Sequence, residues 1–271
     1  MGDQKKAGEI LEAIVDDGNE ELGRASLGLG LSGLAAGLNV SFSAVALGVA
    51  GALTGGVGLV AALLYPIGFL IVILGRSQLY TENTVTPVAV VLTNFSALTN
   101  MLRLWVVIFV ANVIGAILFA AAVVYGEVLP PPAVQVLLEE VAGKLDDGFW
   151  SLTIKAVVGG WLVALIAWLV AASGDTISQA LVIYVLTFLI PAAGLAHCIA
   201  GTTEVMIGVF AGEVSFLEYL GSFLVPATLG NTIGGIVLVA LLNYGQVAGS
   251  NSGAKTSFSG YATETGKRDD S

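Results

Sequence analysis

The chain has little charge, one cysteine and one histidine, and each scarcity excludes a class of protein. Only 11% of its 271 residues are charged, whereas roughly a quarter is usual in a soluble domain, so a soluble globular protein is excluded. Cys198 is the single cysteine, and it therefore cannot form an intrachain disulfide or a cysteine metal cluster. No phosphate loop, zinc site or soluble catalytic motif is found. We expect no enzyme, no cofactor, no metal and no nucleic-acid partner.

Long apolar runs take the place of charge. The hydrophobic residues make up 56% of the chain, and the mean hydropathy is +0.91. Most of the apolar runs approach or exceed the roughly 20 residues that a helix needs to cross the hydrocarbon core, and the alternation typical of a membrane barrel is missing. The sequence therefore predicts an all-α membrane protein with six transmembrane helices, at about 27–50, 57–93 with an interruption, 104–126, 150–172, 177–211 with an interruption, and 219–246.

The second half of the chain repeats the first at an offset of 119 residues, without an insertion. The least accidental matches are Tyr65 with Tyr184, Gly75 with Gly194, Asn112 with Asn231, Gly115 with Gly234, and Tyr125 with Tyr244. Two related halves follow, at about 25–126 and 144–246. Because each half has three spans, an odd number, the second copy lies in the membrane upside down relative to the first. Such a 3+3 inverted repeat places the substrate site near the midplane, where the halves meet.

The basic residues predict the orientation of the chain in a cell membrane. With a cytoplasmic N-terminus, Arg24, Arg103 and the basic residues of both tails lie on one side and mainly Lys144 on the other, which satisfies the positive-inside rule. The segment from about 127 to 149 is then an acidic external loop. We expect residues 1–24 to be a cytoplasmic segment without a signal peptide, residues 25–247 the transmembrane domain, and residues 248–271 a disordered cytoplasmic tail.

Polar residues interrupt the second and fifth spans. The second is interrupted by the decapeptide 75–84, and the fifth by residues 194–204, which include His197. Polar backbone is tolerated at membrane depth only where it is buried in protein or lines a cavity. Gln78 and His197 are equivalent under the 119-residue offset, so we expect the two breaks to face each other and to form the midplane site.

His197, the only histidine, is the first candidate for that site. Its charge changes near neutral pH, and an ionisable group inside a membrane bundle is a functional candidate by default. The alternative is a neutral imidazole that only ties down the broken helix. The hydroxyl of Thr81 could hold His197 or a substrate oxygen, or could cap its own helix. Arg76, Glu82 and Glu204 flank the breaks, where each could line a vestibule, pair with another charge or extend toward the interface.

Three motifs at these positions resemble the formate/nitrite transporter family. Leu79-Tyr80-Thr81 is similar to the family's Leu-Phe-Thr loop, residues 194–200 to its Gly-Phe-Glu-His-Ser-Ile-Ala, and residues 226–235 to its Pro-Val-Thr-Ile-Gly-Asn-Ile-Ile-Gly-Gly. The resemblance covers about residues 24–246. The Leu-Tyr-Thr-Glu-Asn-Thr loop, residues 79–84, resembles that of a divergent branch. The resemblance implies an aquaporin-like fold in which the second and fifth of six helices are broken, and a homopentamer in which each subunit has its own pore.

The resemblance also assigns roles to individual residues. It implies that His197 is the central histidine and Thr81 its partner in the mobile loop, with Gln78 at the position of the loop Asp. The two hydrophobic constrictions correspond to Tyr65, Phe69, Val163 and Ile190. Lys144 matches an outer-vestibule lysine, and Arg24 lies one turn from the inner one. Three more polar residues of the family are replaced here: its fourth-helix Asn corresponds to Gly160, its first-helix Lys falls near Gly28, and the Glu before its central histidine is Ala196. Arg76 and Glu82 add charges to the loop.

The implied activity is passage of small monovalent anions, such as formate or nitrite, with a proton. A bare carboxylate is costly in an apolar slit, whereas the neutral acid crosses more easily, so protonation near His197 would couple the two movements. Two alternatives stay open. The chain could form a pore for water or a small polyol, or it could be a membrane scaffold that transports nothing.

Overall fold

The computed structural model describes residues 5–250, which form helices and short connections without a strand in that range. The first half contains α1 (Ala7–Gly23), α2 (Ser26–Val40), α3 (Phe42–Thr54), α4 (Leu59–Leu64), α5 (Ile67–Leu74), η1 (Glu82–Thr84), α6 (Thr86–Thr93), η2 (Phe95–Ala97) and α7 (Leu98–Tyr125). The second contains α8 (Pro131–Asp146), α9 (Phe149–Ala172), α10 (Thr176–Ala192), α11 (Cys198–Ala211), α12 (Phe216–Glu218), η3 (Tyr219–Leu224), α13 (Val225–Gly235), η4 (Ile236–Leu241) and α14 (Leu242–Ser250). The expected all-α class is confirmed.

Four helical stretches in the described range are long and apolar enough to cross a membrane. They are Ser26–Thr54, Phe95–Tyr125, Phe149–Ala172 and Phe216–Ser250. Two further apolar segments are each divided: α4 and α5 are followed by a break and then α6, and α10 is followed by a break and then α11. The first division agrees with the predicted interruption at 75–84, whereas the second is shorter than the predicted 194–204, because α11 already begins at Cys198.

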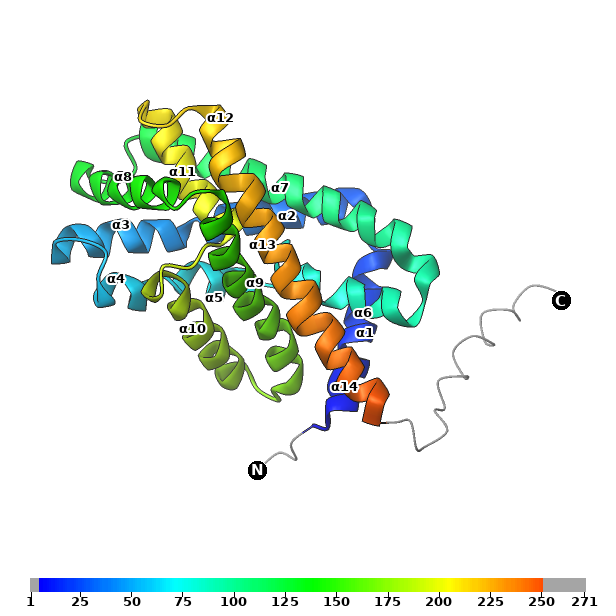
Figure 1. The fold of residues 1–271 in the computed structure, drawn as a ribbon. Coiled ribbons are helices and arrows are strands. Elements are labelled where there is room, and N and C mark those ends of the chain that lie inside the picture. Colours follow the sequence, from blue (N-terminus) through cyan, green and yellow to red (C-terminus); the bar gives the residue numbers. More distant parts are fainter. Residues whose placement is uncertain (1–4, 251–271) are drawn as a thin grey trace.

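Small residues bring the helices of each half into close contact. In the first half, Gly37 of α2 and Gly115 of α7 lie so close to the backbone of the facing helix that an added methyl group would collide with it. These two glycines therefore allow α2 and α7 to pack closely. In the second half, Gly230 and Gly234 of α13 contact the backbone of α9 in the same way. Because lipid gives no hydrophobic drive for helix association, such contacts hold the bundle together. Figure 1 shows these two pairs crossing the molecule.

The first span is divided at Ser41 into α2 and α3, a feature that the sequence pattern does not indicate. The hydroxyl of Ser41 donates to the carbonyl oxygen of Gly37 at 2.8 Å, an i−4 bond of the kind that bends helices. It also bonds the Thr203 hydroxyl of α11 at 2.7 Å. Ser41 thereby ties the first span to the helix that follows the second break.

The segment 127–149 is not the expected loop, because most of it is the helix α8. Pro130 and Pro131 start the helix, and its buried Ala133, Leu137 and Val141 form an i, i+4, i+8 stripe against α3 and α11. The acidic residues fall largely on its other faces. Figure 1 shows α8 beside α3.

Residues 7–23, expected only to be polar and cytoplasmic, form the amphipathic helix α1. Its apolar face buries Ile10, Leu11, Ile14 and Leu22, chiefly against α6, α9 and α14. Arg103 of α7 donates to the last carbonyl groups of α1, those of Leu22 and Arg24, at 2.8 and 3.1 Å, where a cation is favourable. The part of the expected C-terminal tail at 251–271 lies outside the described residues, and 248–250 end α14.

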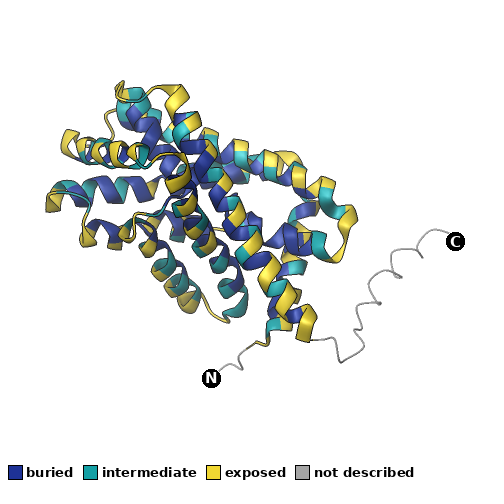
Figure 2. Ribbon diagram, viewed as in Figure 1, coloured by how far each residue is buried: buried dark blue, intermediate teal, exposed yellow. Residues whose placement is uncertain are grey.

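Apolar residues also cover the outside of the bundle. In α7, exposed side chains recur every fourth residue, at Leu102, Val106, Val110, Ile114 and Leu118. Similar stripes follow α10 and α13, and Figure 2 shows exposed residues running along the outer faces of these helices while the buried residues meet at the centre. Apolar stripes of this size on a transmembrane helix face lipid or another subunit.

Candidate functional site

The two breaks begin with the same backbone turn. Arg76 has φ 57° and Gly194 has φ 61°, both in the left-handed region. One residue later, the N–H of Ser77 donates to the Val72 carbonyl at 3.0 Å and that of Leu195 to the Ile190 carbonyl at 2.8 Å. These pairs are 118 residues apart rather than 119. The equivalence of Gln78 with His197 is therefore corrected: Leu79 is the counterpart of His197.

Two asparagines hold the breaks in place. Asn112 accepts from the Tyr80 N–H at 2.8 Å and donates to the carbonyls of Gly33 and Gln78 at 2.7 and 2.9 Å. Asn231 accepts from the Cys198 N–H at 2.8 Å and donates to the carbonyls of Ala156 and Ala196 at 2.7 and 3.0 Å. Each buried amide thus satisfies the backbone groups that an interrupted helix leaves unpaired. The sequence repeat identifies the two asparagines as a pair, but it does not reveal that their side-chain amides form hydrogen bonds with the backbone at the breaks.

His197 is the N-cap of α11 and is buried, with a relative exposure of 2%. Its Nδ1 accepts from the backbone N–H of Ala200 at 3.1 Å. Because a neutral imidazole carries one proton, that proton lies on Nε2. The Nε2–H then donates to the hydroxyl of Thr81, 2.8 Å away on the other break. The predicted contact between Thr81 and His197 is therefore present.

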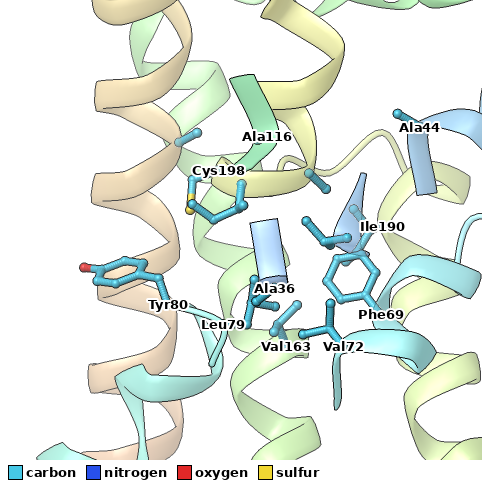
Figure 3. Close-up of a cluster of buried hydrophobic side chains, with 14 of the residues drawn as sticks. Ala36, Ala44, Phe69, Val72, Leu79, Tyr80, Ala116, Val163, Ile190 and Cys198 are labelled. Atoms are coloured by element: carbon cyan, nitrogen blue, oxygen red, sulfur yellow. The ribbon is translucent and has the colours of Figure 1, made fainter. Parts of the chain in front are cut away.

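Apolar side chains surround this polar pair. The ring of Phe69 meets the His197 ring edge-on with 5.0 Å between centroids, and Tyr65 packs on Phe69 at 5.8 Å. Val163 and Ile190 are buried too. Figure 3 shows Phe69 and Ile190 side by side, with Val72, Val163 and Leu79 close to them. All four residues expected at the constrictions thus lie in the core.

Gln78 does not face His197. Its backbone N–H donates to the Ser32 hydroxyl at 3.1 Å, and its side-chain amide donates to the Glu21 carboxylate of α1 at 3.2 Å. The other oxygen of Glu21 accepts from the Thr86 hydroxyl at 2.8 Å. Glu21 thus fastens α1 to both ends of the first break. No signal in the sequence identified Glu21, because it lies in a run of acidic residues that reads as solvated surface.

The charged residues around the breaks are arranged unequally. Arg76 is exposed, and Glu82 is partly buried within electrostatic range of Glu21 and Arg76. Arg24 is partly buried beside the end of α1. On the other side of the molecule, Lys144 of α8 is not a free cation, because its ammonium group forms an ion pair with Glu204 of α11.

Two of the glycine and alanine departures from the family pattern lie in tight contacts. The Cα of Gly160 lies against the backbone of Asn231, so a side chain at 160 would collide with it. Ala196 is buried, and its carbonyl accepts from Asn231. Gly28, by contrast, has open space around its Cα.

A pH-dependent docking of α1 follows from Glu21. Burial raises the pKa of its carboxyl above the ordinary 4.5, outweighing the hydrogen bonds from Thr86 and Gln78. The docked helix therefore binds the proton more tightly than the released helix does. This contribution to docking is full below pH 4.5 and is lost as pH rises through the raised pKa. Hydrogen-exchange protection of α1 amides, corrected for intrinsic rates, should fall across that window in the wild type.

The matched variant Glu21→Gln keeps a neutral amide in the same place. Its α1 protection should not change with pH in that window. A wild-type profile as flat as that of Glu21→Gln would show that Glu21 does not control the docking.

Comparison with known proteins gives a consistent result. The family model described as formate/nitrite transporter matches residues 8–245. The chain is 31% identical over 247 residues to the inner membrane protein YfdC of Escherichia coli (strain K12), covering 89% of this chain and 79% of that protein. It is similar in structure to an FNT family ion channel, with TM-score 0.76, 21% identity and coverage of 88% and 98%. A pentameric formate channel with formate bound gives TM-score 0.69, 18% identity and coverage of 83% and 98%.

Proposed function

Because the chain belongs to the formate/nitrite transporter family, we propose that it is a membrane pore for small monovalent anions and that His197 links their passage to a proton. Formate and nitrite are the first solutes to test, since the family model carries both names and one similar structure contains formate. The family consists of transporters and channels rather than enzymes.

The observation that carries the proposal is the bond between Nε2 of His197 and the hydroxyl of Thr81. It joins the two breaks within the apolar core, where the ring of Phe69 meets the imidazole edge-on. Figure 3 shows Ile190 next to Phe69. A weak-acid anion crossing such an apolar core is strongly favoured to become neutral. The imidazole and the hydroxyl are the groups placed to exchange a proton with it or to hold its oxygen.

The hydrogen bond at Nδ1 sets how His197 would take up a second proton. Nδ1 accepts from the Ala200 N–H, so an imidazolium forms only when this bond opens and Nδ1 becomes a donor. Protonation is thus coupled to the loss of the side-chain cap that His197 gives to α11. Since Asn231 holds the same turn through the Cys198 N–H, the backbone stays in place while the ring is free to turn.

The wider arrangement of the molecule is part of the proposal. We infer a transmembrane domain at 25–247 in two halves, with both termini cytoplasmic, and a homopentamer. Support for the pentamer comes from the similar channel described as pentameric and from the exposed apolar stripes of α7, α10 and α13, which can pack against neighbouring subunits or lipid.

Proteoliposomes with an internal pH dye test the function directly. Formate, nitrite, acetate and lactate are added in turn under an inward acid gradient. We expect internal acidification faster than in empty liposomes, with formate or nitrite giving the highest rate. Rates equal to those of empty liposomes for every solute would rule out the weak-acid pathway.

A pore for small neutral solutes is the second candidate, because Lys144 is paired and thus does not attract anions as a free cation would. Vesicle swelling separates the two functions. Equal swelling rates in glycerol and in formate would favour the neutral pore, whereas swelling in formate alone would favour the anion pathway.

A further inference from the structure

The ion pair between Lys144 and Glu204 is the most deeply buried charge pair in the described part of the chain. The Glu204 side chain is fully buried, and that of Lys144 is 20% exposed. Lys144 lies near the C-terminal end of α8, and Glu204 lies two turns along α11 from His197. The lysine can therefore be approached from outside the bundle, while the carboxylate belongs to its interior.

Two aromatic residues, Tyr65 and Phe69, relate this pair to the central histidine. Tyr65 is within electrostatic range of the Glu204 carboxylate. Its ring packs on Phe69, which meets the ring of His197. The charge of the pair thus acts on Tyr65, whose ring is linked through Phe69 to the proposed midplane site.

One oxygen of Glu204 has no partner. Lys144 donates to Oε2, whereas Oε1 is buried and receives no hydrogen bond within residues 5–250. An unpaired oxygen on a buried carboxylate is costly, and a group that brings a donor to it is stabilising. A carboxylate oxygen accepts hydrogen bonds, so Oε1 can be satisfied by an O–H or N–H donor. A bare formate or nitrite ion has no such donor.

The local charges also oppose a bare anion. Glu140, one helical turn before Lys144 on α8, is within electrostatic range of both members of the pair. One cation and two carboxylates therefore lie near one another, and the ion pair is formed by Lys144 and Glu204. An anion that bound Lys144 would have to displace Glu204 and leave a buried carboxylate without its partner, which is strongly unfavourable.

We propose that Glu204 is a specificity-determining residue of the proposed pore. Its ion pair with Lys144 keeps bare anions from binding the lysine, whereas a weak acid in its neutral form is admitted because its hydroxyl donates a hydrogen bond to Oε1. This inference rests on the proposed function. It makes passage through the outer half electroneutral, because the proton enters together with the anion.

Voltage-driven formate flux tests the inference. Proteoliposomes hold the full chain, and a potassium diffusion potential drives charge movement at neutral pH, where formic acid is scarce. The wild type should show little electrogenic flux. Glu204→Gln frees Lys144 and should raise that flux about tenfold, which corresponds to ~1.4 kcal/mol. Removing both charges, in Lys144→Met with Glu204→Gln, should return it to the wild-type level.

The matched control is Glu213→Gln, which makes the same charge change at an exposed position just after α11 and should leave the flux unchanged. Size-exclusion chromatography checks that each variant assembles. Unchanged electrogenic flux in assembled Glu204→Gln, or total loss of flux, would overturn the inference. If the wild type carries formate with a proton in the pH-dye assay, that result leaves the proposed function intact.

A second measurement does not depend on transport. Acetic anhydride modifies lysine amines, and peptide mass spectrometry reports the rate at Lys144. The ion pair protects this amine in the wild type, so Glu204→Gln should speed the modification, and formate should slow it in that variant alone. Equal rates in both proteins, or equal protection by formate in the wild type, would contradict the inference even if no solute is transported.

Discussion

Replacing His197 with asparagine is expected to abolish proton-linked flux while leaving the protein folded and assembled. Asparagine is a good N-cap residue, and its side-chain oxygen can accept the Ala200 N–H that Nδ1 accepts now. It cannot take up a proton near neutral pH. Loss of a positioned acid–base group lowers a rate by about 10²–10⁴, and we expect a fall in this range for formate-driven acidification.

The comparison with His197→Phe separates the two roles of the histidine. Phenylalanine removes the cap as well as the titrating group, so it should also lower the free energy of unfolding, by about 1 kcal/mol for the cap. Thermal unfolding in detergent and the dye assay are measured on the same preparations. Wild-type flux in His197→Asn would mean that His197 is a helix cap and nothing more.

The position of the site could be predicted from the sequence because the breaks are polar and the spans are not. The decapeptide 75–84 and the segment around His197 cannot lie in lipid, so their burial follows from composition alone. Two polar segments that must both be buried at the same membrane depth are expected to pack against each other. The contact between Thr81 and His197 agrees with that expectation.

The register of the repeat could not be predicted in the same way. Through the breaks, equivalent backbone bonds lie 118 residues apart, as in Ser77 and Leu195, whereas Asn112 and Asn231 lie 119 apart. In a chain this rich in apolar residues, an alignment shifted by one residue still matches Leu with Ile or Val, so the apolar residues do not distinguish an offset of 118 from one of 119. Hydrogen bonds, which the sequence does not display, decide between the two alignments.

Long-range charge pairing also escaped sequence reasoning. Lys144 and Glu204 are 60 residues apart, and they meet because α8 is a helix lying on α11. With 127–149 treated as a loop, no rule would join them. Glu21 likewise contacts Gln78 only because α1 folds onto the first break. The sequence analysis missed both contacts because it treated the charged segments 1–24 and 127–149 as solvent-exposed surface.

The substitution Gly160→Asn is expected to prevent assembly, although the family resemblance implies an asparagine at this position. The Cα of Gly160 lies against the backbone of Asn231, and an added Cβ would lie well inside the van der Waals contact distance of its carbonyl oxygen. Overpacking alone costs about 1–3 kcal/mol. Here it also displaces the residue that holds the second break, whose three hydrogen bonds contribute roughly 1 kcal/mol each.

Gly28→Lys is the matched comparison, because it too introduces the residue type of the family, and at a position with open space around it. Size-exclusion chromatography and thermal unfolding should show Gly28→Lys assembled like the wild type and Gly160→Asn aggregated or strongly destabilised. A well-assembled Gly160→Asn would mean that α9 and α13 can separate without loss of the break. If it does fail, the glycine at 160 is what lets α9 approach Asn231 this closely, and the fourth helix has no room for a polar pore residue there. The polar groups near the midplane would then be those of His197 and Thr81, and the charges that set selectivity would have to lie farther out, where Lys144 and Glu204 meet.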